Sequence, residues 1–189
     1  MIERFGPLLL IAGLAGTIAD AIGHSPRASI AVAMLVGAAA LIPIGKLSAV
    51  DYFYSLTGPL SAASLTMIGI GIAGFVWRDQ PIDARSGVAV LAVMVPILAL
   101  PLYAAVIAGW SFDPYRWGFG GWVLPAGLFV LLAVGLWFGA FAVALWLALA
   151  GALYLAGGYA SRNLVDYLVD PTAVIIAIVV LARVFLRAA

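Results

Sequence analysis

The strongest constraint in this sequence is a succession of long apolar stretches separated by very few charged residues. Of the 189 residues, 66% are hydrophobic and only 9% are charged, and the mean hydropathy is +1.21. Soluble domains carry roughly 25% charged residues, so this composition does not supply a water-facing surface. A bilayer needs no polar coat on the protein, provided that the backbone is hydrogen-bonded internally, as it is in a helix. The sequence therefore predicts an all-α integral membrane protein.

Seven apolar stretches are candidates for membrane-spanning helices, which need about 20 residues with a range of roughly 17–25. They predict a polytopic transmembrane helix bundle with short loops, organised as a single integral membrane domain over residues 1–189. The predicted spans are residues 7–23, 28–45, 60–77, 87–109, 123–136, 140–158 and 171–187. Pro96 and Pro101 predict a kink in the fourth span, because proline removes a helical hydrogen bond.

The apolar run from Val123 to Ala160 is too long for a single span. One helix of that length would reach roughly 57 Å, against about 30 Å for a hydrocarbon core. We expect two helices with a turn near Trp137, Phe138 and Gly139, although no charge marks that turn. If the run were one helix, the bundle would have six spans and every later loop would change sides. With seven spans, the distribution of basic residues favours an outside N-terminus and a cytoplasmic C-terminus.

Three polar segments share one form, in which an aspartate lies close to a tyrosine and to a proline. They cover residues 51–61, 112–116 and 163–171, and with seven spans all three lie on the same membrane face. A candidate surface site for a cation or a lipid head group therefore comprises Asp51, Asp113, Arg116, Asp166 and Asp170.

The alternative interpretation of the same aspartates is helix capping. An aspartate before a proline is typical of a helix start, because the carboxylate accepts from free backbone amides and proline suits the first helical turn. Asp113 and Asp170 both have this form. Asp166 and Asp170 would repel each other on one helical face, and Arg162, four residues before Asp166, would offset that repulsion.

Asp20 and His24 form a second candidate, an intramembrane polar pair near the end of the first span. A spacing of four residues places both on one helical face. A charge inside the hydrocarbon costs at least about 2.5–3.5 kcal/mol, so Asp20 should face protein or water, and histidine titrates near neutral pH. In the alternative, the helix ends near Asp20 and both groups are in water; the sequence leaves both open.

Several chemistries have no residues to support them. With no cysteine and one histidine, the chain offers no thiolate site and no multi-histidine ligation, so we expect neither a metal nor a cofactor. There is no phosphate-binding P-loop and no Gly-x-Ser-x-Gly motif. A net charge of +1 without a basic run gives no basis for nucleic-acid binding.

These features favour a small multi-pass protein of a bacterial-type inner membrane that is not an enzyme. It would bind or translocate a small solute or ion, or act as a membrane subunit of a larger complex. Its expected partners are the lipid bilayer and either a second copy or another membrane protein, since abundant Gly and Ala allow close helix approach. The alternative is a membrane enzyme that acts on a lipid-linked substrate, with Asp51, Asp113 and Asp166 converging around a cleft at the interface.

Overall fold

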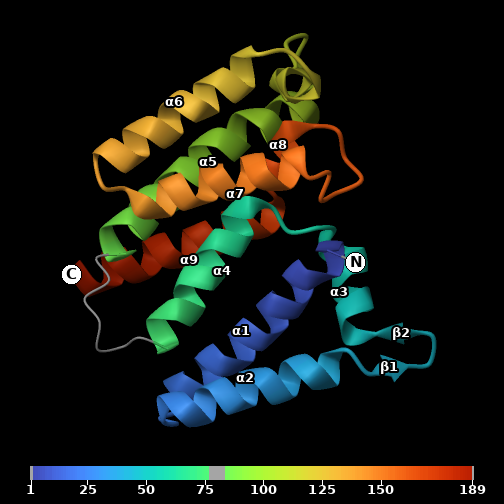
Figure 1. Cartoon of the computed structure of the whole chain (residues 1–189), viewed down its shortest axis with the longest axis vertical. Helices are drawn as coiled ribbons and strands as arrows, with labels where there is room; N and C mark the ends of the chain where they lie inside the picture. The colour runs from blue at the N-terminus through green and yellow to red at the C-terminus, as the bar shows by residue number, and fades with distance from the viewer. Residues whose placement is uncertain (1, 77–83, 189) are drawn as a thin grey trace. The chain divides into compact units, whose positions relative to one another are not determined.

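The computed structural model describes residues 2–76 and 84–188, and this part of the chain is almost entirely helical (Figure 1). The prediction of an all-α protein is confirmed; a single two-residue β-hairpin, β1 (Pro43–Ile44) with β2 (Leu47–Ser48), is the exception among the described residues. The α-helices are α1 (Phe5–Ala21), α2 (Pro26–Ala40), α3 (Ala49–Thr57), α4 (Ala62–Val76), α5 (Ala84–Ala108), α6 (Val123–Trp137), α7 (Phe141–Leu155), α8 (Leu164–Leu168) and α9 (Pro171–Ala188), and the short 3-10 helices are η1 (Ile2–Arg4) and η2 (Pro114–Phe119).

The chain separates into two compact units. Unit 1 comprises residues 1–60 and 68–82, and unit 2 comprises residues 61–67 and 83–189, so that α4 contributes to both. In unit 1, α1 packs along α2, and in unit 2, α5 packs against α9 and α7 while α6 packs against α7. The organisation of residues 1–189 as a single membrane domain stays a prediction.

Glycine ends three of the apolar helices in the same way. After α1, α6 and α7 the chain turns at Gly23, Gly139 and Gly157, whose φ angles are 92°, 69° and 62°. At each turn two amides bond back to the helix; after α6, for instance, Gly139 N–H donates to the Leu136 carbonyl and Ala140 N–H to the Gly135 carbonyl. This is the Schellman arrangement, which needs a left-handed residue and no charge. It divides the run from 123 to 160 into α6 and α7.

Two helical segments of the described chain are long and apolar enough to cross a membrane, Gly87–Ala108 and Leu164–Leu186. Both belong to unit 2. Five further apolar helices are shorter, namely Phe5–Ala21, Pro26–Ala40, Ala62–Ala73, Val123–Trp137 and Phe141–Leu155. Seven membrane spans therefore stay a prediction, and the predicted end of the third span at residue 77 lies outside the described residues. The α5 helix continues through Pro96 and Pro101, and the kink expected there also stays a prediction.

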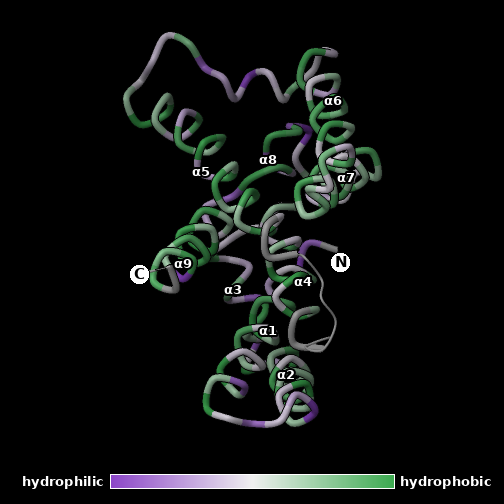
Figure 2. Tube along the Cα trace, turned by 90° about the vertical axis from the view of Figure 1, so that its left-hand side faces the viewer, coloured by the Kyte–Doolittle hydropathy of each residue, from purple (hydrophilic) through white to green (hydrophobic). Residues whose placement is uncertain are grey.

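Large apolar side chains are exposed along several helices, and a few polar side chains are buried. Figure 2 shows hydrophilic colour mainly at connections and helix ends, whereas the helices are largely hydrophobic along their length. In α6 only Gly135 is buried, and the exposed side chains include Phe129 (71%) and Val130 (59%). The buried core is mainly apolar, but it also encloses several polar side chains, among them Ser61 and Ser64. The buried polar residues are Ser29, Ser48, Ser61, Ser64, Thr66, Asn163 and Asp170.

Candidate functional site

A break between α8 and α9 positions Asp170. Val169 is extended, with φ −137° and ψ 149°, and α9 begins directly afterwards at Pro171. The Asp170 carboxylate accepts from the backbone N–H of Ala173 at 2.8 Å, so it caps α9 as its position before proline predicts. Its side chain is 7% exposed, which makes it an internal group rather than part of a surface site.

The same carboxylate also binds the start of α4. The backbone N–H of Ser61 donates to Asp170 Oδ2, and the Ser64 hydroxyl donates at 2.9 Å to Oδ2 and 3.0 Å to Oδ1. Ser61 and Ser64 are both fully buried. We call this cluster of Asp170, Ser61, Ser64 and Ala173 the Asp170 junction. Two helix N-termini meet there on one negative charge, which suits the positive ends of their dipoles.

The donors at the Asp170 junction are amides and a hydroxyl, and no basic side chain of the described residues pairs with the carboxylate. A buried carboxylate is costly unless its lone pairs are satisfied, and here three groups satisfy them. The Asp170 junction is therefore a closed structural unit in which both carboxylate oxygens are already in use.

A second cluster joins η2 to the segment before α8. The Tyr115 hydroxyl lies 2.7 Å and 2.8 Å from the two oxygens of Asp166, and the Ser161 hydroxyl also donates to Asp166. The Asn163 side-chain amide donates to the Tyr115 carbonyl at 3.0 Å, while its oxygen accepts from Val165 N–H at 2.9 Å. We call Tyr115, Ser161, Asn163 and Asp166 the Asp166 network.

Electrostatics and packing both hold the Asp166 network together. Burial, followed by the hydrogen bond to the Asp166 carboxylate, raises the pKa of Tyr115 well above its usual value. Gly118 is buried against Asn163, and a methyl group added there would overlap the Asn163 side chain and approach Val165 to 2.9 Å. Glycine at position 118 is thus required by close approach rather than by its backbone angle.

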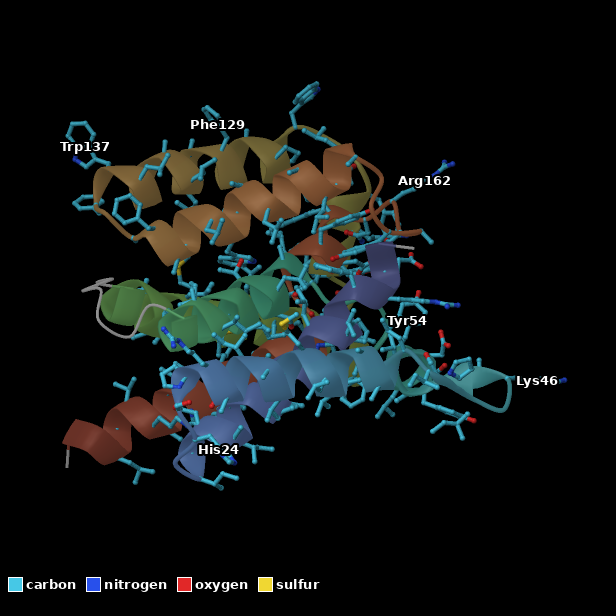
Figure 3. All side chains as sticks on the ribbon, turned by 60° about the horizontal axis from the view of Figure 1, so that its bottom comes forward. His24, Lys46, Tyr54, Phe129, Trp137 and Arg162 are labelled. Atoms are coloured by element: carbon cyan, nitrogen blue, oxygen red, sulfur yellow. The ribbon has the colours of Figure 1, made fainter. Side chains whose placement is uncertain are left out.

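The other predicted members of the surface site have separate environments. Asp113 caps η2, accepting from Tyr115 N–H at 3.0 Å. Arg116 and Arg162 are exposed and form no ion pair within the described part of the chain, and Figure 3 shows Arg162 projecting away from the helices. The expected pairing of Arg162 with Asp166 is therefore wrong, because the Tyr115 and Ser161 hydroxyls occupy that carboxylate instead.

Asp51 belongs to unit 1 and is the N3 residue of α3, whose N-cap is Ser48. Its carboxylate accepts from Ser48 N–H at 2.9 Å and from the Ser48 hydroxyl at 2.8 Å, in a reciprocal capping box, and it lies 3.0 Å from Arg4. The backbone bond from Ser48, then its hydroxyl, with a smaller contribution from Arg4, lowers the pKa of Asp51. Next to it, Tyr54 donates to Glu3 at 2.9 Å, which raises the pKa of Tyr54. These bonds fix η1 to α3.

Asp20 and His24, the candidate intramembrane pair, lie on either side of the end of α1. The α1 helix ends at Ala21, and the glycine turn at Gly23 carries His24 off the helix, where it is exposed. His24 therefore does not continue the helical face on which Asp20 lies, because the Schellman turn reverses the chain between them. Asp20 itself is half-buried.

Five contributors to these clusters were absent from the sequence-based site, namely Ser61, Ser64, Tyr115, Ser161 and Asn163. Two of them had a local signal: Ser61 and Asn163 both precede helices, where serine and asparagine are favoured N-caps. For metal binding, no group of three or more His, Cys, Asp or Glu side chains converges within residues 2–76 and 84–188. Each aspartate of the predicted surface site instead serves a helix end or a tyrosine.

Comparisons with models of protein families, with curated proteins and with solved structures find no match for this chain.

Proposed function

We propose that this chain is a small multi-pass protein of a bacterial-type inner membrane that acts without catalysis, as a membrane subunit. The observation that carries the proposal is the apolar surface that the helices expose. Along α6 most apolar side chains are exposed, while Asp170, Ser61 and Ser64 are buried. In water this exposed apolar surface would make protein molecules associate, whereas in a bilayer it contacts the apolar acyl chains of the lipid.

Contacts within each unit support the seven-span arrangement. In unit 1, Tyr54 bonds Glu3 and Asp51 pairs with Arg4, so the N-terminus and α3 lie at one end. In unit 2, Tyr115 bonds Asp166, so the connections before α6 and after α7 also share an end. With seven spans, the two partners of each of these contacts lie on the same membrane face. With six spans, residues 123–160 would form a single helix, and the connections before and after it would lie on opposite faces.

The subunit role is supported by how the carboxylates are used. Asp113 and Asp170 cap helices, Asp51 belongs to the capping box of α3, and Asp166 is bonded by two hydroxyls. Polar groups already satisfied inside the protein do not line a path for a solute. Translocation of a small solute or ion is the other form of the proposal, and it predicts that reconstituted vesicles leak ions faster than empty ones. The subunit role predicts vesicles as tight as empty ones.

Cysteine labelling tests the membrane topology directly, because the natural chain has no cysteine. Single cysteines replace exposed residues at Lys46, Arg116 and Arg162 on one expected face, and at His24 and Phe138 on the other. In intact cells an impermeant maleimide should label only one of these two sets, and the other set only after the membrane is opened. Recovery of the chain in the soluble fraction, or a mixture of both sets on one face, would contradict the proposal.

A second candidate function, an enzyme acting on a lipid-linked substrate, is favoured by one observation. Asp113 and Asp166 both bond Tyr115, so two carboxylates lie at the same end of unit 2. That function predicts that purified protein alters the head group of a lipid-linked substrate, as followed by mass spectrometry. It also predicts that the change disappears in Asp166→Asn while the fold is retained.

A further inference from the structure

We propose that this protein fits a bilayer thinner than the usual membrane, and that the α6–α7 hairpin sets the preferred thickness. The inference rests on the proposed function, since it presupposes insertion into lipid. Its partner is a lipid surface of defined chemistry, a bilayer with short acyl chains.

The lengths of the apolar helices are the first argument. α2, α6 and α7 each have 15 residues, and α1 has 17. At about 1.5 Å per residue these helices rise about 22 Å to 26 Å, against about 30 Å for a typical hydrocarbon core. The shortfall recurs in both units, so it does not depend on one irregular element.

Exposed tryptophans mark both ends of α6. Trp122 precedes the helix and is 87% exposed, and Trp137 ends it and is 86% exposed. Figure 3 shows Trp137 pointing away from the end of the helix, with Phe129 midway along it. Tryptophan favours the interface between head groups and acyl chains. The two rings are 15 helical residues apart in sequence, which places the two interfaces about 22 Å apart along this helix.

The ends of the hairpin are fixed and leave no room to lengthen either helix. Gly139 has a φ of 69°, and the amides of Gly139 and Ala140 bond back to α6 before α7 begins at Phe141. At the other end of α7, Gly157 turns the chain with a φ of 62°. Extending either helix through these turns would break their hydrogen bonds, which is costly where no water replaces them.

The longer helices accommodate a thin bilayer more easily than the short helices accommodate a thick one. α5 has 25 residues and α9 has 18. A helix longer than the hydrocarbon core can tilt, whereas a shorter one requires the bilayer itself to thin. The short helices therefore decide the preferred thickness.

Reconstitution of the full chain into vesicles of different thickness tests the inference. The lipids are monounsaturated phosphatidylcholines with short, medium and long chains, about 14, 18 and 22 carbons. The measurement is the fraction of protein that floats with the vesicles after alkaline extraction and keeps its helical circular dichroism. We expect the largest fraction in the short-chain lipid and a decrease of about tenfold in the long-chain lipid. Equal fractions in all three, or a maximum at the medium or long chain, would overturn the inference.

Two variants of α6 provide a matched comparison. Trp137→Leu removes an exposed ring at the helix end, and Phe129→Leu removes an exposed ring at its middle. Trp137→Leu should shift the optimum toward longer chains, and Phe129→Leu should leave it unchanged. If the two variants behave alike, the tryptophan does not set the thickness and the inference fails. Failure of the natural chain to float with any lipid would instead reject membrane insertion itself, and the proposed function with it.

Discussion

Asp170 and Asp51 perform the same local task in different surroundings. Each carboxylate accepts backbone hydrogen bonds at a helix start, Asp170 as the residue before α9 and Asp51 as the N3 residue of the capping box of α3. Asp170 is buried and bonded to two helix starts, and no basic side chain within residues 2–76 and 84–188 forms an ion pair with it. Asp51 is near the surface and paired with Arg4, whose side chain is 65% exposed. The comparison teaches that the contribution of such a carboxylate to the free energy of unfolding depends on whether water can take its place as the acceptor for the helix-start amides.

The largest expected effect is that of Asp170→Ala. This change leaves the amides of Ser61 and Ala173 and the Ser64 hydroxyl buried without an acceptor. We expect the free energy of unfolding to fall by about 3–5 kcal/mol, since each unsatisfied group costs about 1–3 kcal/mol and part of the loss is relieved by relaxation. Unfolding in mixed micelles, followed by circular dichroism, measures the loss. An equal or larger loss in Asp51→Ala would break the comparison.

An intermediate effect is expected for Gly118→Ala, which attacks the Asp166 network through packing rather than charge. The added methyl group overlaps Asn163 and displaces η2 from the segment before α8. We expect a loss of about 1–3 kcal/mol, typical of overpacking a well-packed site. Gly127→Ala in α6 is the control, because no atom lies within 4 Å of its added methyl group. Unchanged stability in Gly118→Ala would show that Asn163 can move away from residue 118 without a loss of stability.

A smaller effect is expected for Tyr115→Phe, which removes the hydroxyl bonded to Asp166. The bond is only partly buried, so we expect a loss of about 1 kcal/mol at neutral pH. Because the pKa of Tyr115 is raised, the folded state holds this proton more tightly than the unfolded state. That contribution is fully present below pH 10.0, the usual tyrosine value, and is lost as the pH rises further. A stability titration from pH 8 upward should show this decline in the natural chain and in Tyr52→Phe, but less of it in Tyr115→Phe.

The smallest effect is expected for Asp51→Asn. The pKa of Asp51 lies below its usual value of 3.8, so its contribution is present above pH 3.8 and is lost as the pH falls through the lowered value. The variant should therefore lower stability slightly at neutral pH, where the contribution of Asp51 is present, and flatten the acid limb of the stability curve. Arg4→Gln should reproduce only a minor part of this, because the Ser48 bonds act more strongly than Arg4. A larger effect of Arg4→Gln than of Asp51→Asn would contradict the assignment.

Features that depend on neighbouring residues could be predicted from the sequence. Proline after Asp113 and Asp170 indicated helix starts, and the turn near Gly139 follows from a glycine that alone tolerates the required backbone angle. The helical face that one alternative gave to Asp20 and His24 stops before Gly23, where the same kind of glycine turn ends α1. Glycine was thus the more reliable boundary than the last apolar residue.

The sequence by itself determined an apolar, helical chain and indicated helix starts at Asp113 and Asp170, because composition and capping act over a few consecutive residues. Only the tertiary structure decided which distant groups share each carboxylate. Ser61 reaches Asp170 across 109 residues, and Tyr115 reaches Asp166 across 51. Those partners follow from how α4, η2 and the segment around α8 pack. The sequence pattern of a cap does not contain this information, because it is the same whether the carboxylate remains in water or is enclosed by two helix ends.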